Sequence, residues 1–251
     1  MKLPKKIAAL LTVTLVASSA GNLSFADTTN VSEDKLVGAG RWETAIEVSK
    51  KGWTQATEAV IVNDSSIADA LAATPFAEAK NAPILLTGKD KLNEKTAEEL
   101  NRLGVTKVYL IGGEAVLNKA IETELVENKK LQVERISGDT RELTALEIAK
   151  KLNDIKKVSE IAVVNGTTGL ADAVSIAATA ADRDMAIILS NPTEGTKASD
   201  EFIKDDMTSY IIGGENAVST EVEKNLPNAK RISGVDRNET NAKVIETFYT
   251  V

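Results

Sequence analysis

Short apolar runs alternate with longer amphipathic stretches along most of this chain. The runs are rich in valine, isoleucine and leucine and are bounded by asparagine, glycine or proline, as in strands that are buried on both faces. The stretches between them place apolar residues at i, i+3 and i+4, which is typical of helices with one buried face. The pattern therefore predicts a chain in which strands and helices alternate.

The predicted elements fall into two similar sets. In the first set the strands are residues 59–63, 83–87 and 107–111, and the helices are residues 68–80, 96–103 and 118–128. Residues 133–137 open the second set, which has a helix at 140–152 and strands at 161–165, 186–190 and 209–212. Such alternation implies parallel strands with right-handed crossovers. The expected fold class is α/β, with three-layer modules and mostly parallel sheets.

One motif occurs three times: a glycine, an arginine three residues later, and a threonine three residues after that. Its arginines are Arg41, Arg141 and Arg237, so the copies are 100 and 96 residues apart. Because a period near 100 residues is the size of a domain, we expect tandem modules. Module 1 is predicted at residues 35–134 and module 2 at residues 135–230, followed at 231–251 by the start of a third module.

The first 26 residues have the pattern of an export signal. A head with three lysines precedes an apolar stretch at residues 7–17, and Ser24-Phe25-Ala26 fits a cleavage site. We expect cleavage between Ala26 and Asp27, which leaves a short flexible leader at residues 27–34 and no membrane span. A retained anchor is the alternative, but the apolar stretch is shorter than the roughly 20 residues that a span needs.

Composition excludes several kinds of chemistry. The chain has no cysteine and no histidine, so it lacks a thiol nucleophile, the usual zinc ligands and the commonest general base. Without the three signal lysines, 27 basic residues stand against 37 acidic ones, a formal charge of −10. Such a surface is a poor partner for nucleic acid or anionic membranes. An aromatic content of 4% argues against a sugar-stacking platform, and no cofactor or metal is expected.

The recurring arginines fall in the first turn of predicted helices, directly after residues that are acceptable N-caps. A cation there opposes the helix dipole at a cost of roughly 0.3–1 kcal/mol, so its recurrence indicates an anionic partner. One interpretation is a buried ion pair with Asp69 or Asp172. The other is an external anion that is bound with the help of helix N-termini. The sequence leaves both interpretations open.

Two asparagines, Asn63 and Asn165, end equivalent strands at the edge where open α/β sheets bind ligands. They are candidate ligand contacts, although a role in stabilising the next turn would explain them equally well. The pairs Gly112-Gly113 and Gly213-Gly214 close later strands. They lack the third spaced glycine and the lysine of a phosphate-binding loop, so we expect tight turns there.

These repeated blocks together resemble the cell wall binding repeat type 2 family of clostridial and related Gram-positive surface proteins. The motifs that carry the resemblance lie at residues 68–72, 82–87, 111–113 and 135–144, and it covers almost all of residues 36–251. The resemblance implies Rossmann-like modules, usually three around a pseudo-threefold axis. It also implies noncovalent binding to an anionic wall polysaccharide, with effector activities in other domains. This chain departs from the pattern in having two modules and only the beginning of a third.

We therefore expect a secreted, non-catalytic anchor at the cell wall or surface layer. The candidate polymer contacts are the three arginines with Asn63 and Asn165, and the candidate arginine partners are Asp69 and Asp172. Two alternatives remain. A wall-polymer hydrolase or amidase would use Asp69 and Asp172 as its carboxylates. A purely structural assembly protein would instead bind other surface-layer proteins.

Overall fold

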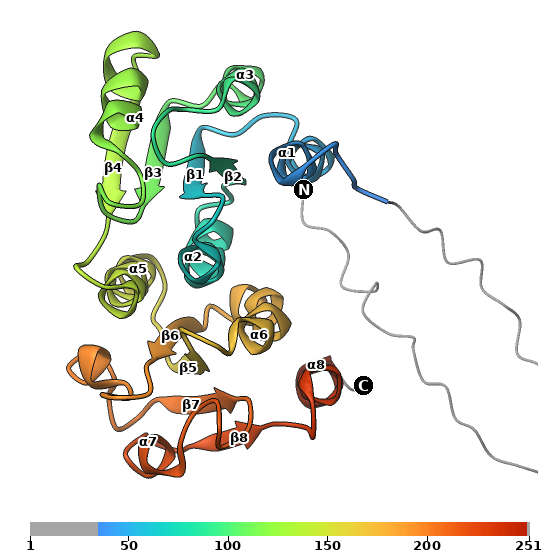
Figure 1. Cartoon of the computed structure of the whole chain (residues 1–251), viewed down its shortest axis with the longest axis vertical. Coiled ribbons are helices and arrows are strands. Elements are labelled where there is room, and N and C mark those ends of the chain that lie inside the picture. Colours follow the sequence, from blue (N-terminus) through green and yellow to red (C-terminus); the bar gives the residue numbers. More distant parts are fainter. Residues whose placement is uncertain (1–34, 250–251) are drawn as a thin grey trace, which may run out of the picture.

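The computed structural model describes residues 35–249. The predicted signal peptide at residues 1–26, its cleavage site at Ala26 and Asp27, and the leader at residues 27–34 lie outside the described residues. Within residues 35–249, no helix has the length and apolar character needed to cross a membrane. Figure 1 shows two α/β units stacked along the longest axis of the molecule.

Module 1 is built around a sheet of four parallel strands in the order β2-β1-β3-β4. The strands pair in register, with Val60 opposite both Ile84 and Tyr109. Its elements in chain order are α1 (Arg41–Gly52), β1 (Glu58–Asn63), α2 (Ile67–Ala79), β2 (Ile84–Thr87), α3 (Glu94–Leu103), β3 (Lys107–Ile111), α4 (Lys119–Thr123), the π-helical turn η1 (Glu124–Asn128) and β4 (Gln132–Ile136).

Module 2 repeats this sheet with four parallel strands in the order β6-β5-β7-β8. A helix that begins at the third copy of the glycine–arginine–threonine motif packs beside it, against α6. The elements are α5 (Arg141–Ile155), β5 (Glu160–Asn165), α6 (Leu170–Asp182), β6 (Ala186–Ser190), the 3-10 turn η2 (Lys197–Ser199), β7 (Thr208–Ile212), α7 (Thr220–Lys224), β8 (Lys230–Ile232) and α8 (Arg237–Tyr249).

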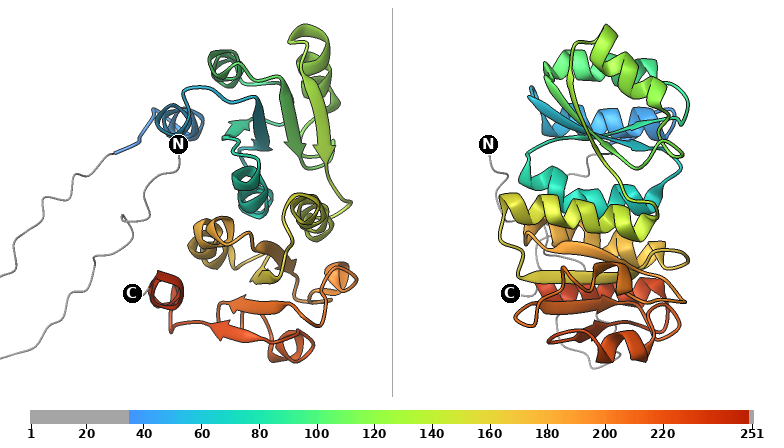
Figure 2. Two further views of the ribbon diagram at one scale, coloured as in Figure 1. Left: turned by 180° about the vertical axis from the view of Figure 1, so that it is seen from behind. Right: turned by 90° about the vertical axis from the view of Figure 1, so that its left-hand side faces the viewer.

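The predicted α/β class is confirmed: the two sheets are parallel throughout, and helices cover their faces (Figure 2). The central strands are buried on both faces, as their uniformly apolar sequences indicate. The helix predicted at residues 118–128 is present in two parts, because its second half widens into the π-helical turn η1. Strand order is not readable from the sequence. The strand expected at residues 133–137 as the opening of the second set is β4, which instead pairs with β3 and completes the first sheet.

Module 2 lacks a counterpart of η1, and it differs from module 1 most at η2, which stands where module 1 has the ten-residue helix α3. In module 1, the Asn93 side chain caps the start of α3, and Gly104 ends it in the left-handed conformation. The corresponding part of module 2 contains Pro192 and Gly195, and a small backbone bridge joins Asn191 to Gly195. The segment therefore turns back on itself before a helix can form.

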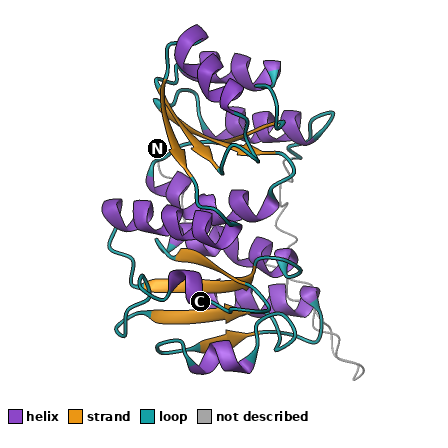
Figure 3. Cartoon of the chain, turned by 60° about the vertical axis from the view of Figure 1, so that its left-hand side comes forward, coloured by secondary structure: helices purple, strands orange, loops and turns teal. Residues whose placement is uncertain are grey.

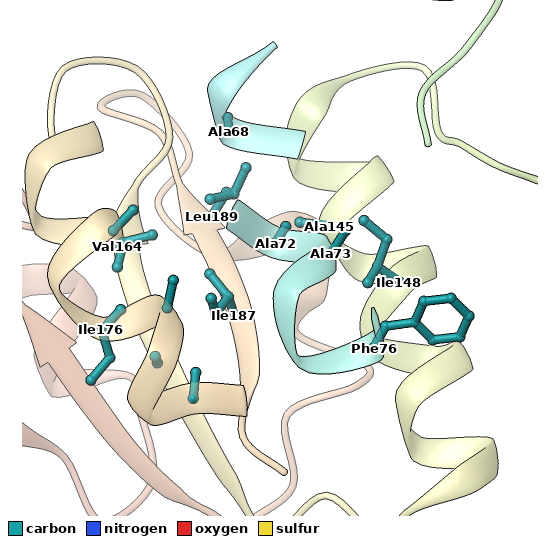
Figure 4. Packing of buried hydrophobic residues seen from close by; sticks show 14 of the residues in the cluster. Ala68, Ala72, Ala73, Phe76, Ala145, Ile148, Val164, Ile176, Ile187 and Leu189 are labelled. Carbon is teal, nitrogen blue, oxygen red and sulfur yellow. The ribbon is translucent and has the colours of Figure 1, made fainter. Parts of the chain in front are cut away.

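A single apolar cluster joins the two modules. Helices α2, α5 and α6 lie between the two sheets, as Figure 3 shows in purple. Figure 4 shows Ala72 and Phe76 of α2 beside Ile148 of α5, and Ile176 of α6 belongs to the same cluster. All four are at most 2% exposed. Each module also has its own cluster on the far side of its sheet. The molecule thus has three apolar layers, and the central layer belongs to both modules.

Candidate functional site

The glycine and threonine of the repeated motif fix the start of each arginine-bearing helix. The backbone N–H of Gly138 donates a hydrogen bond of 3.0 Å to the Thr144 hydroxyl, and the same bond joins Gly38 to Thr44 at 3.1 Å. A β-carbon on Gly138 would lie 2.4 Å from that of Leu143, so no larger residue fits there. The motif therefore holds its arginine in a defined place at the helix N-terminus.

Two of the arginines bond to the same point of the fold in successive modules. Arg41 Nη1 donates to the carbonyl oxygen of Asp64 at 2.8 Å, and Arg141 Nη1 donates to that of Gly166 at 2.7 Å. Each carbonyl directly follows the asparagine that ends a central strand. Arg237 begins α8, and no hydrogen-bond acceptor for its side chain is recorded among residues 35–249. The arginines thus lie at the carboxyl edge of the sheets.

A buried carboxylate lies near Arg141, on the other side of the junction between the modules. Asp69 is in the first turn of α2 and is 4% exposed. The Ser66 hydroxyl donates to its Oδ2, whereas Oδ1 has no partner in the described part of the chain. Burial raises the pKa of Asp69, and the hydrogen bond from Ser66 and the positive charge of Arg141 oppose that rise. Module 1 therefore supplies the carboxylate and module 2 the arginine.

The second aspartate repeats this arrangement with the last arginine. Burial raises the pKa of Asp172, and the nearby charge of Arg237 opposes the rise. Both aspartates lie against a glycine with positive φ in the turn after the third strand of their module, at φ +104° for Gly112 and +108° for Gly213. A β-carbon on Gly213 would lie 2.6 Å from Asp172 Oδ2. The tight turns expected at these glycines leave room for the carboxylates.

The structure shows where the candidate aspartates Asp69 and Asp172 lie relative to the motif arginines. A buried fork would place guanidinium and carboxylate in direct contact, yet no ion pair links Arg141 with either aspartate in the described structure. The aspartate whose pKa responds to Arg141 is Asp69 of the preceding module, not Asp172 of its own. Sequence spacing could not reveal this because the partner depends on how the modules pack. Asp69 and Asp172 lie in separate modules, and each pKa responds to a different arginine.

Asn63 and Asn165 hold loops in place. They are 7% and 2% exposed. The Asn63 amide donates to the carbonyl of Val116 at 2.7 Å, and its oxygen accepts from the N–H of Ser65 at 2.7 Å. Asn165 makes the equivalent bonds, to Ala217 and from the turn after β5. The structure thus uses both side chains to stabilise turns, the second of the two roles considered from sequence.

Sequence reasoning missed the function of a second arginine in each repeat. Arg135 Nη1 donates to the carbonyls of Gly112 and Leu117 at 2.8 and 3.0 Å, and its Nε bonds to Glu122 at 3.0 Å. Arg231 makes the matching bond to Gly213 at 2.8 Å. The shared string Arg-Ile-Ser-Gly was the signal for this role. These arginines tie the last strand of each module to the glycine turn beside its aspartate, which is buried in module 1 and half-buried in module 2.

An open depression of about 370 Å³ lies at the carboxyl edge of the first sheet. It is lined by Asn63, Asp64, Ser65, Ser66, Lys89, Ala115 and Val116. Lys89 is an exposed cation on this edge. Within residues 35–249, no group of three or more His, Cys, Asp or Glu side chains is placed to hold a metal ion. The depression suits a polar ligand that lies on the surface.

Comparison with known proteins identifies the modules. The model of the family described as Cell wall binding domain 2 (CWB2) matches twice, over residues 35–122 and 135–223. The chain belongs to the CWB2 family. The two CWB2 matches fall on the two parallel sheets of the structure.

Two curated relatives from Bacillus subtilis (strain 168) contain a similar region. The N-acetylmuramoyl-L-alanine amidase LytC is 32% identical over 214 residues, which cover 84% of this chain and 42% of the relative. The protein named amidase enhancer is 32% identical over 216 residues, which cover 85% of this chain and 29% of the relative. The chain thus spans less than half the length of these relatives.

Two solved structures from Clostridium difficile share the CWB2 architecture. Cwp6 matches with a TM-score of 0.80 and 34% identity, covering 90% of this chain and 39% of Cwp6. Cwp8 matches with a TM-score of 0.78 and 38% identity, covering 86% of this chain and 38% of Cwp8. The fold of both modules is therefore that of bacterial cell wall proteins.

Proposed function

We propose that the two CWB2 modules hold an exported protein at the cell wall by noncovalent, non-catalytic binding of an anionic wall polysaccharide. The observation that carries the proposal is the position of Arg141 at the module junction. Its side chain is exposed, and its one recorded hydrogen bond uses Nη1. The other N–H groups of the guanidinium are free to meet a carboxylate or phosphate of a ligand.

The buried aspartate supports this role. A carboxylate with a raised pKa and an unpartnered oxygen lowers stability, and such groups cluster at functional sites. Asp69 is out of reach of a ligand because it is 4% exposed. We infer that its negative charge helps to orient Arg141 across the junction. Since the protein carries more acidic than basic residues, recognition of an anionic polymer must come from local sites of this kind.

A catalytic role has less support. The relatives named for amidases are more than twice as long as the region they share with this chain. Asp69 and Asp172 lie in separate modules beside separate arginines, whereas hydrolysis by two carboxylates needs both at one bond. An assay for release of labelled wall fragments tests this alternative, and turnover by the purified chain would contradict the anchoring proposal.

The proposal is tested by retention of the protein on purified cell walls. Arg141→Ala should weaken binding roughly tenfold, the effect of losing a hydrogen bond to a charged group. The matched control is Lys130→Gln, which removes an exposed cation far from the motif and should bind normally. Unchanged retention of Arg141→Ala, together with a large loss of stability, would show that the arginine serves the fold.

Walls stripped of their anionic polysaccharide separate polymer binding from assembly with other surface proteins. The wild-type protein should be retained on intact walls and lost from stripped walls. A purely structural assembly protein would instead bind purified surface-layer proteins, and its retention would not depend on the polymer.

Export is tested by N-terminal sequencing of the protein extracted from walls. The sequence should begin at Asp27 if the predicted signal is removed, and an intact Met1 would contradict the export proposal.

A further inference from the structure

The missing helix of module 2 leaves a cleft on the outer side of α5. In module 1, helix α3 lies beside α1 and occupies this position. In module 2 the short turn η2 replaces it, and a cavity of about 640 Å³ opens between α5 and the segment that follows η2. Leu146 and Met207 line its floor and are 7% and 6% exposed, and Phe202 lies at its side. The floor is therefore apolar.

The rim of this cleft is basic, in contrast to the protein as a whole. Its lining includes four lysines, Lys150, Lys157, Lys197 and Lys204, against the two acids Glu201 and Asp206. No ion-pair partner is recorded for Lys157 or Lys197 in the described structure, and both are exposed. Their charges are therefore available to a ligand.

The equivalent cleft of module 1 provides an internal comparison. It has a volume of about 360 Å³ and lies between α1 and α3. Its lining has four acids, Glu43, Glu47, Glu98 and Glu99, against the three cations Lys50, Lys95 and Arg102. Lys95 is paired with Glu43 at 2.6 Å. The loss of one helix has thus given module 2 a larger cleft with the opposite net charge.

We propose that the cleft lined by Lys157, Lys197 and Phe202 is a second binding site for the wall polysaccharide, and that it takes an acidic sugar unit. The inference rests on the proposed function. The lysines match the carboxylate or phosphate of such a unit, and the apolar floor matches the C–H face of its ring. The acidic surface as a whole repels an anionic chain, so a local basic cleft favours its approach.

The test replaces Lys157 and Lys197 with glutamine in one protein and measures its binding to purified anionic wall polysaccharide. Loss of two exposed charged contacts should weaken binding roughly five- to tenfold. The melting temperature should stay unchanged, because neither lysine has a recorded partner in the described residues. Substitution of both by arginine keeps the charges and should keep the affinity.

The matched control removes two charges from the equivalent cleft of module 1, through Lys50→Gln with Lys95→Gln, and should bind like the wild type. Equal binding by the Lys157→Gln, Lys197→Gln protein and the wild type would overturn the inference and leave the proposed function standing. Equal weakening by the control would also overturn it, since general charge would then explain the effect. Failure of the wild-type protein to bind the polysaccharide at all would instead overturn the proposed function.

Discussion

The glycine of the repeated motif is required by contact and not by an unusual backbone angle. None of Gly38, Gly138 and Gly234 has positive φ, but a β-carbon on each would lie 2.3 to 2.4 Å from the side chain five residues later. The threonine hydroxyl then closes the loop on the glycine N–H. The motif is therefore a hydrogen-bonded loop that fixes the start of a helix, and the arginine is in the first turn of that helix.

Gly138→Ala should lower the free energy of unfolding by about 1–3 kcal/mol, because the β-carbon forces the loop away from Leu143. The control is Gly88→Ala, where a β-carbon would meet no atom within 4 Å and the change should stay within about 0.5 kcal/mol. Denaturant unfolding measures both. Equal stability of the two variants would show that the loop relaxes without cost.

Asp69 is predicted to lower stability at neutral pH. Since burial raises its pKa above the ordinary value of 3.8, the folded state binds a proton more tightly than the unfolded state does. The contribution of Asp69 to stability therefore falls as pH rises from 3.8 through the folded pKa, and above that pKa the full penalty remains.

Asp69→Asn should accordingly raise the melting temperature at pH 7 and flatten the pH dependence of stability relative to the wild type. Thermal unfolding between pH 4 and pH 7 measures the difference between the two proteins. If Asp69 were instead the structural partner of Arg141, its replacement would lower the melting temperature, because the arginine would lose a stabilising charge.

At the scale of elements, each glycine turn is held by an arginine from the last strand of its module. Arg135 joins β4 to the turn after β3 and to Glu122 of α4. Its side chain is 15% exposed. Lys119 pairs with the same carboxylate but is 58% exposed. Glu122 thus has one partner that is largely buried, Arg135, and one that is exposed to solvent, Lys119.

Arg135→Ala should lower the free energy of unfolding by about 2 kcal/mol, because two turn carbonyls and Glu122 lose a donor in a largely buried place. Arg135→Lys should recover less than half of the loss, since an ammonium group cannot span the same acceptors. Lys119→Ala is the control and should cost less than about 1 kcal/mol. Comparable losses for Arg135→Ala and Lys119→Ala in denaturant unfolding would contradict this interpretation.

At the scale of the whole molecule, the shared central cluster buries residues of module 2 whose equivalents in module 1 are exposed. Val48 and Ile148 stand seven residues after the motif arginines in α1 and α5, but Val48 is 46% exposed and Ile148 is 2% exposed. The reason is that α5 packs against α2 of the preceding module. Helix α1 has no such neighbour in the described structure.

Ile148→Ala should therefore lower the free energy of unfolding by about 3 kcal/mol, whereas Val48→Ala should lower it by less than about 0.5 kcal/mol.

Because the central cluster belongs to both modules, we also expect calorimetry to show one cooperative transition, with equal calorimetric and van't Hoff enthalpies. Ile148→Ala should shift that transition to lower temperature without splitting it. Two separate transitions in the wild type would show that the modules unfold independently.

The sequence alone determined the α/β class, the repeat and every strand of the described residues except β8. Strands buried on both faces are continuously apolar, and that pattern is local enough to read at residues such as Val60 to Val62. The sequence also located Arg41, Arg141 and Arg237 at the starts of helices, because capping residues and the repeat are local signals.

Only the tertiary structure decided which groups these arginines meet. Arg141 lies near Asp69 across the module junction, and its hydrogen bond goes to a backbone carbonyl that no side-chain pattern records. The cleft of module 2 likewise depends on the absence of a helix beside α5, although its lysines are plain in the sequence. Periodicity reports which face of an element is buried, whereas the packing of elements decides what lies against that face.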